Sequence, residues 1–142
     1  MPYLDTSIVV AYYLPEPLSV RAQAIYRAPN ELAISELVEL EFLAVLSVLL
    51  RTGNLERIEA ERVASLFLSH LGGGWYTRIH LHVGHYLAAR GFIARFDLPL
   101  KSPDALHLAV SAGERLPLIT ADQQLARNAE SLGLEVELVR PA

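Results

Sequence analysis

The stretch Ser102–Ala109, with the sequence SPDALHLA, is the part of the chain from which the fold is best interpreted. Proline is favoured at the first position of an α-helix and serine at the N-cap before it, so we expect Ser102 to cap a helix that begins at Pro103. Asp104 then lies in the first turn, where the positive end of the helix dipole stabilises a carboxylate. His107 follows three residues later on the same face. Asp104 is either a capping charge or part of a functional site, and the positions of the other acidic residues distinguish these two interpretations.

Short apolar segments alternate with longer helical patterns on both sides of this stretch. We expect strands at residues 3–4, 32–34, 75–79, 116–120 and 135–139. The helices are expected at residues 8–14, 19–27, 36–51, 55–71, 82–96, 103–112 and from 123 through 132. Strands separated by helices, with no hairpin signals, predict an α/β fold with a short, mainly parallel five-stranded sheet surrounded by helices.

Size and composition restrict the class of protein. The 142 residues, of which 52% are hydrophobic and 20% charged, predict one folded domain over residues 1–142 and exclude a disordered chain. The longest nearly apolar run, Phe42–Leu50, is too short to span a membrane, and Met1–Asp5 has no export signal. The chain has no cysteine, which excludes disulfides and thiolate metal sites and favours a cytoplasmic protein. The net charge of −4 provides no overall basic field for nucleic acid.

The predicted helix at 36–51 is apolar on almost every face, which is typical of a helix in the core or in a subunit interface. Glu36 and Glu39 fall in its first turn, where carboxylates are common. Glu41 lies further in, between Leu40 and Phe42, where an unpaired charge is costly. A bound metal ion or a partly exposed face would each explain Glu41. Asn54 is expected to cap the next helix, whose apolar face comprises Leu55, Ile58, Val63, Leu66 and Phe67.

Four acidic residues are placed to meet at one edge of the sheet. Asp5 and Asp122 each follow a strand and precede a helix, and ligands of parallel sheets bind outside the carboxyl ends of the strands. Glu41 and Asp104 lie near the starts of two helices. Close carboxylates stay ionised together only when a cation holds them, and an all-oxygen set suits Mg²⁺ or Mn²⁺. Scattered capping acids are the alternative.

Four motifs in this order resemble the PIN domain. They are YLDTS at 3–7, Ser35 with Glu41 six residues later, PDALHLA at 103–109, and Thr120-Ala121-Asp122 followed by Asn128-Ala129 and Leu132–Leu134. The resemblance covers Tyr3 to about Val139, and the small size is similar to that of VapC-type toxins from toxin–antitoxin pairs. It implies a three-layer α/β/α fold and a Mg²⁺- or Mn²⁺-dependent endoribonuclease, usually a homodimer, held inactive by a cognate antitoxin protein.

The same resemblance implies roles for particular residues. Asp5, Glu41, Asp104 and Asp122 match the four acidic positions of the family, as metal ligands and catalytic residues. Thr6, Ser7, Thr120 and His107 are expected to support them by hydrogen bonds, with His107 acting beside Asp104. Two points stay open: Glu39 lies close enough to be confused with Glu41, and Gln123-Gln124 follow Asp122 where many relatives carry a basic residue. The apolar helices at 36–50 and 55–71 are expected to bind the second protomer and the antitoxin.

Other residues have two interpretations each. His80, His82 and His85 suggest zinc, but only His82 and His85 share a helical face and no cysteine assists. Aromatic residues can stack on bases or fill the core, and basic residues can bind RNA phosphates or lie in solvent. These residues are Tyr12, Tyr13 and Trp75, and Arg51, Arg57, Arg62, Arg78 and Lys101.

Three rival functions follow from the same pattern. A phosphoacceptor signalling domain also gathers acids around Mg²⁺, but it needs a paired acidic motif after the first strand and a lysine after a later one; Asp5-Thr6-Ser7 and Leu118-Ile119-Thr120 supply neither. A stand-alone PIN-type nuclease that processes RNA would carry the same acids. A non-catalytic PIN-like binding module would have lost one or more of the four.

Overall fold

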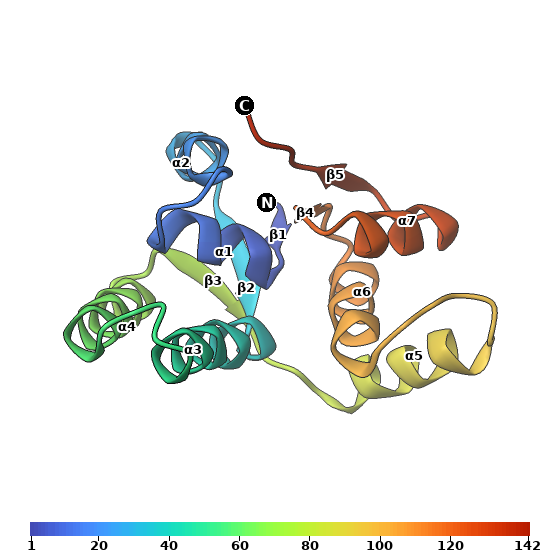
Figure 1. The fold of residues 1–142 in the computed structure, drawn as a ribbon. Coiled ribbons are helices and arrows are strands. Elements are labelled where there is room, and N and C mark those ends of the chain that lie inside the picture. The colour runs from blue at the N-terminus through green and yellow to red at the C-terminus, as the bar shows by residue number, and fades with distance from the viewer.

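Five short parallel strands form the centre of the computed structural model, which describes residues 1–142 (Figure 1). They are β1 (Tyr3–Leu4), β2 (Leu32–Ser35), β3 (Tyr76–Ile79), β4 (Leu118–Thr120) and β5 (Val136–Leu138). Their order across the sheet is β3-β2-β1-β4-β5, and each neighbouring pair is parallel. The predicted α/β class with a short parallel sheet is confirmed.

Helices connect all the strands and cover the sheet. They are α1 (Thr6–Tyr13), α2 (Ser19–Arg27), α3 (Glu36–Arg51), α4 (Arg57–Gly72), α5 (Val83–Ala94), α6 (Ser102–Glu114) and α7 (Gln123–Ser131). In Figure 1, α2, α3 and α4 lie in the left half of the picture around β2 and β3, and α5, α6 and α7 lie in the right half. None of these helices combines the length and apolar character that crossing a bilayer requires.

The core explains why β1 can be so short and still occupy the centre of the sheet. Tyr3 pairs with Ala33 on one side and Leu118 on the other, and both residues of β1 are fully buried. Above them, the rings of Phe42 in α3 and Phe67 in α4 pack with centroids 4.6 Å apart. Burial of these apolar surfaces packs β1, which Asp5 follows, into the same core as α3, which carries Glu41.

A second, small core joins α5 to α6 and consists only of alanines: Ala89, Ala105 and Ala109. Short side chains at these positions allow the two helices to approach closely. The close packing places the first turn of α5 beside α6, so side chains of the two helices can contact one another.

Three helix details differ from the sequence-based expectations. Asn54 does not cap α4: its side-chain amide donates to the Thr52 hydroxyl at 2.8 Å, and the helix begins after Glu56. Ser102 is the first residue of α6 and not its N-cap; Lys101 occupies that position without a side-chain capping bond. The helix also continues to Glu114, and its C-cap Arg115 adopts a left-handed conformation with φ of 56°.

The buried faces of α3 and α4 are narrower than predicted. In α4 the buried residues are Ala60, Val63, Phe67 and Leu71, a regular three-to-four spacing. Ile58 is 74% exposed and Leu66 is exposed as well, so the predicted buried face is wrong at these two residues. The reason is that α4 carries apolar residues on two faces, and only one of these faces packs on the sheet. In α3, whose predicted bounds are confirmed, only Val38, Phe42 and Leu46 are buried.

Candidate functional site

Asp5 lies between β1 and α1 and is almost completely buried, at 5% exposure. Its Oδ1 accepts a hydrogen bond from the Ser7 hydroxyl at 2.6 Å, and its Oδ2 accepts one from the Thr120 hydroxyl at 2.8 Å. The Ser7 oxygen also accepts the backbone N–H of Ala121 at 2.9 Å. Ser7 and Thr120 therefore hold the carboxylate in one orientation and join the end of β1 to the segment that follows β4.

Asp122 caps α7 at the end of that segment. Its Oδ1 accepts the backbone N–H groups of Gln124 and Leu125 at 2.9 and 3.0 Å, and its own N–H donates to the Thr120 hydroxyl at 3.0 Å. The other carboxylate oxygen has no hydrogen-bond partner, and the residue is exposed. The cap therefore fixes the carboxylate and leaves one oxygen free to bind a ligand.

Glu41 is held by two donors, although it lies on a helix that is mainly apolar. Its Oε1 accepts the Thr6 hydroxyl at 2.7 Å and the His107 Nε2–H at 2.6 Å. Burial raises the pKa of Glu41, but the hydrogen bonds and charge of His107, together with the bond from Thr6, outweigh it, so the pKa is lower than usual. Glu41 is thereby kept ionised, and its Oε2 stays free.

His107 has a supporting role, but its two ring nitrogens bond Tyr3 and Glu41 and not Asp104. The ring is 3% exposed, and its Nδ1 lies 2.8 Å from the Tyr3 hydroxyl, which lies 2.7 Å from the Ser35 hydroxyl. Burial raises the pKa of Tyr3, so its hydroxyl remains a donor. Since an ionised carboxylate only accepts, the His107 Nε2–H donates to Glu41. Ser35, Tyr3 and His107 then form one continuous chain of hydrogen bonds that ends on Glu41.

The role of Tyr3 is the part of the site that sequence reasoning missed. The signal was present, because a tyrosine in a buried central strand needs a partner for its hydroxyl. The sequence could not show that this partner comes from residue 107, more than a hundred positions away.

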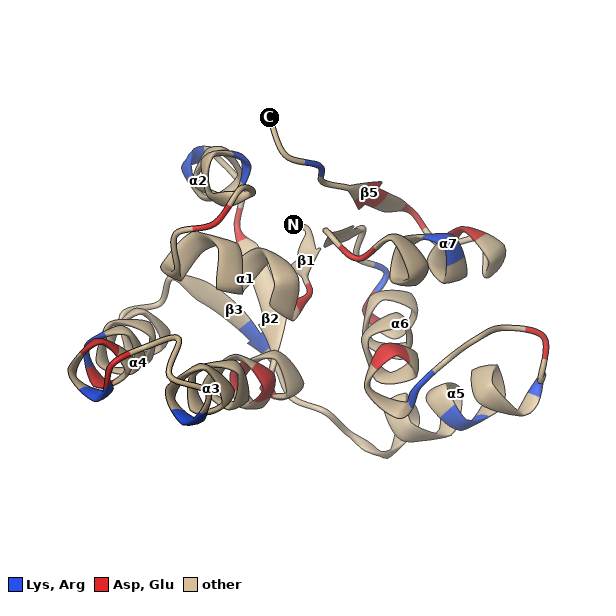
Figure 2. Ribbon diagram, viewed as in Figure 1, with Lys and Arg blue, Asp and Glu red and all other residues tan.

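Asp104 lies in the first turn of α6, half-buried and facing the other acids. Burial raises its pKa, and the negative charges of Asp122 and Glu41 raise it further, whereas His107 and a backbone hydrogen bond from Lys101 lower it. The pKa of Asp5 is also raised, by burial first, with Asp122 adding to the effect. These effects link Asp122 to Asp5 and to Asp104, and Glu41 to Asp104. Figure 2 shows acidic segments in α3, at the end of β1, in α6 and before α7.

The four carboxylates fit a hard divalent cation. The donors are all oxygen, two of the groups are destabilised as anions by burial and by each other, and Glu41 and Asp122 each keep an uncommitted oxygen. No three of them come within 4.8 Å of one another. These carboxylates would therefore contact an ion such as Mg²⁺ largely through the waters that it retains.

Ion pairs and hydrogen bonds show where Glu39 and the candidate arginines bind. Both carboxylate oxygens of Glu39 bind the Arg78 guanidinium, at 2.8 and 2.9 Å, so Glu39 lies outside the cluster. Arg78, Arg57 and Arg62 all pair with glutamates, and Arg51 donates to Ser47. Lys101, beside Asp104, forms no ion pair and stays exposed.

The aromatic candidates pack on other side chains. Tyr12 stacks on Tyr26 with ring centroids 3.7 Å apart, and Trp75 stacks on His70 at 3.4 Å. Tyr13 donates to or accepts from His70 and Tyr76 through its hydroxyl. Tyr12 and Tyr13 are half-buried among these rings, which corresponds to the core interpretation, whereas Trp75 remains 46% exposed and keeps both interpretations.

Removing the charge of Asp5 should stabilise the metal-free protein at neutral pH. Because the folded-state pKa of Asp5 is raised above its ordinary value of 3.8, its contribution to stability is present below that pH and is lost as the pH rises through the folded pKa. In EDTA at pH 7, Asp5→Asn should therefore melt a few degrees above the parent. The difference in Tm, followed by circular dichroism, should shrink as the pH approaches 4. An Asp5→Asn variant that melts below the parent at pH 7 would contradict this assignment.

The chain matches one protein-family model and several solved structures. The family model described as PIN domain matches residues 3–131. No curated protein matches the sequence significantly.

Several solved structures share the fold at low sequence identity. Mycobacterium tuberculosis VapC20, described as a toxin that cleaves the sarcin-ricin loop, is 19% identical, covers 99% of this chain and 100% of its own, and has a TM-score of 0.70. VapBC2 from Rickettsia felis, bound to a promoter DNA fragment, has a TM-score of 0.68 at 19% identity over 99% of this chain and 100% of that one. FitAcB from Neisseria gonorrhoeae has 0.69 at 15% identity, with 96% of each chain covered.

Proposed function

Because the chain belongs to the PIN domain family, we propose that it is a metal-dependent endoribonuclease that acts as the toxin of a toxin–antitoxin pair. The observation that supports the proposal is that the pKa values of Asp5 and Asp104 are raised by burial and, further, by the negative charges of Asp122 on both and of Glu41 on Asp104. A binding module without catalytic activity has no need to keep four carboxylates in such an unfavourable arrangement.

The residues have separate tasks in this mechanism. Asp5, Glu41, Asp104 and Asp122 would hold Mg²⁺ or Mn²⁺, directly or through water. The bound ion supplies an activated water and stabilises negative charge on the phosphoryl oxygens. Ser7 and Thr120 hold Asp5, and Thr6 and His107 hold Glu41, so that the carboxylates need not reorganise when phosphate enters. Lys101 is the exposed cation nearest in sequence to Asp104 and is our candidate for a phosphate contact.

The proposed partners are an antitoxin protein and a second copy of the chain. A structure from Klebsiella pneumoniae that is described as a toxin–antitoxin complex shares the fold, with a TM-score of 0.60 at 21% identity over 86% of this chain and 87% of that one. An apolar groove of about 370 Å³ borders the site, lined by Thr6, Glu41, Ala44, Val45, Val48 and Leu49. Leu40 is 71% exposed on the same helix, α3, and provides further apolar surface for a homodimer. Another groove, of about 590 Å³ between α2 and β5, contains none of the four acids. A cytoplasmic location is part of the proposal, because the RNA substrate is there.

Incubation of the purified chain with RNA tests the activity. We expect internal cuts with Mg²⁺ or Mn²⁺ and no cuts in EDTA, read by gel electrophoresis of end-labelled RNA. Calorimetric titration with Mn²⁺ is the companion measurement: a non-catalytic module would bind Mn²⁺ weakly or not at all. Cleavage that persists in EDTA would overturn the metal-dependent mechanism.

A further inference from the structure

The structure contains a second group of metal-ligating side chains, outside the four-carboxylate site. From the arrangement of His82, His85 and Glu114, we propose that this group binds a Zn²⁺ ion at the contact between α5 and α6. Glu114 follows Asp104 by ten residues, which is about 15 Å along a helix, so the two sites lie at opposite ends of α6. The proposal is independent of the nuclease function.

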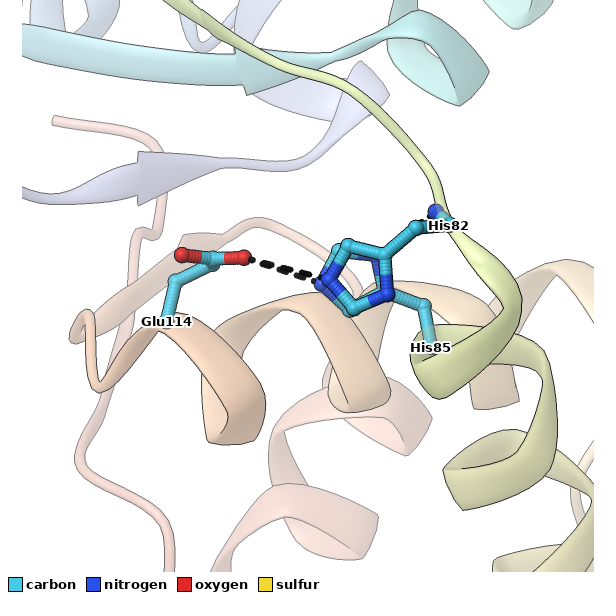
Figure 3. A group of neighbouring side chains, drawn as sticks. All are labelled: His82, His85 and Glu114. Atoms are coloured by element: carbon cyan, nitrogen blue, oxygen red, sulfur yellow. Dashed lines mark hydrogen bonds and ion pairs between the residues drawn. The ribbon is translucent and has the colours of Figure 1, made fainter.

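The three ligand atoms already face one another. Figure 3 shows both imidazole rings directed toward the same carboxylate oxygen of Glu114. His85 Nε2 lies 3.1 Å and His82 Nε2 lies 3.9 Å from Glu114 Oε1, and all three atoms lie within 4.8 Å of one another. Ligand atoms of a tetrahedral zinc ion are about 3.3 Å apart, from metal–ligand distances of roughly 2.0–2.1 Å. To bring the three atoms to one ion, the exposed His82 ring must rotate out of its stack on His85.

The local sequence builds this geometry. His82 is the N-cap of α5 and His85 is three residues later, so their rings stack with centroids 3.8 Å apart. Gly84 makes room for the stack: a Cβ atom there would lie 2.8 Å from the Cε1 of His82. His85 is 2% exposed and lies against Gly113, the residue before Glu114. One ligand is therefore rigid, and the other two are accessible to an ion from solvent.

The charges at this site also favour a cation. Glu114 has no arginine or lysine partner; its ion-pair contacts are the two histidines alone. Two imidazoles with one carboxylate are typical ligands of Zn²⁺ with an open fourth position, whereas Mg²⁺ prefers oxygen ligands. The two sites of this chain therefore prefer different ions. The absence of cysteine, which weakens the zinc interpretation of the sequence, is compensated by a carboxylate that only the fold brings close.

Binding of the ion must rearrange the start of α5. Without metal, Nδ1 of His82 accepts the Gly84 N–H at 3.0 Å and Nδ1 of His85 accepts the His82 N–H at 3.3 Å, so each Nε2 carries the proton. Coordination through Nε2 moves each proton to Nδ1 and releases these two capping bonds. The backbone amides of His82 and Gly84 therefore report metal binding at this site directly.

Calorimetric titration of the full chain with Zn²⁺ tests the proposal, in an Asp5→Asn, Asp104→Asn background that disables the carboxylate site. We expect one ion per chain with an affinity in the micromolar range. His82→Gln or Glu114→Gln should each weaken binding roughly ten-fold or more, because each removes one of three ligands. His80→Gln is the matched control: this exposed histidine lies near Glu36, not in the cluster, and should leave the affinity unchanged.

Two outcomes would overturn the zinc site: no binding by the background protein, or affinities of His82→Gln and Glu114→Gln within two-fold of it. Both substituted side chains are exposed, so the variants should fold, which circular dichroism verifies. The NMR signals of the His82 and Gly84 amides should shift with Zn²⁺ in the background protein but not in Glu114→Gln. Loss of RNA cleavage in the same background would concern the carboxylate site only.

Discussion

Asp5→Asn and Asp104→Asn should each reduce Mg²⁺-dependent RNA cleavage by roughly a hundred-fold or more. A bound divalent ion contributes several kcal/mol of transition-state stabilisation, and a loss of about 3 kcal/mol corresponds to a rate decrease of about a hundred-fold. Asparagine preserves the size of each side chain but removes the charge that holds the ion. Initial rates of cleavage with excess Mg²⁺ measure the effect.

Asp97→Asn is the matched control for these two variants. Asp97 is exposed and pairs with Arg95 on the surface, so its loss should leave the rate unchanged. Asp5→Asn should keep the Tm of the parent or exceed it in EDTA, so that lost activity with retained stability identifies a functional acid. A variant of Asp5 or Asp104 that cleaves RNA as fast as the parent would remove that residue from the site.

The second large effect should follow from His107→Leu. The substitution removes one of the two donors to Glu41 and one of the two partners of the Tyr3 hydroxyl, so Glu41 keeps only Thr6 and Tyr3 keeps only Ser35. We expect a loss of about 1–3 kcal/mol in the free energy of unfolding, measured by urea denaturation. If His107 only stabilises the fold, this loss of stability should be the only effect of the substitution.

A change in pH dependence separates support of Glu41 from support of the fold. His107 lowers the pKa of Glu41, so in His107→Leu the Glu41 carboxyl should protonate at higher pH, and the acidic limb of the pH–rate profile should move upward. His107→Gln, which keeps a donor, should recover part of both effects. His80→Leu, on the surface, is the control. An unchanged acidic limb in His107→Leu would show that His107 acts on stability alone.

Local patterns predicted the elements of this fold well, because each depends on neighbouring residues. The bounds of α2 and α3 are those expected, and Ser35 caps α3 through its hydroxyl. Where apolar residues lie on two faces, as in α4, the pattern does not say which face packs, and the expectation for Ile58 was wrong. The cap at Ser102 was wrong by one position, which changes no side chain of the site.

The site could be predicted only at the level of residue type. The topology of a parallel sheet brings Asp5 and Asp122 to one edge, and that followed from the sequence. The bond from His107 to Glu41 and the arrival of Glu114 at His82 depend on how helices pack, which no local pattern encodes. The assignment of the four acids as metal ligands stays a prediction until the variants are measured.

The position of β1 has a consequence for how the protein opens. β1 is the middle strand of the sheet. The N–H groups of Tyr3 in β1 and of Asp5, which follows it, donate to the carbonyls of Pro117 and Ile119 along the neighbouring strand β4. Such amides exchange with solvent only when the whole domain unfolds, whereas termini and loops open locally. Asp5 is therefore attached to the last part of the chain to lose its structure. Partial unfolding of peripheral helices would leave the backbone beneath this acid in place.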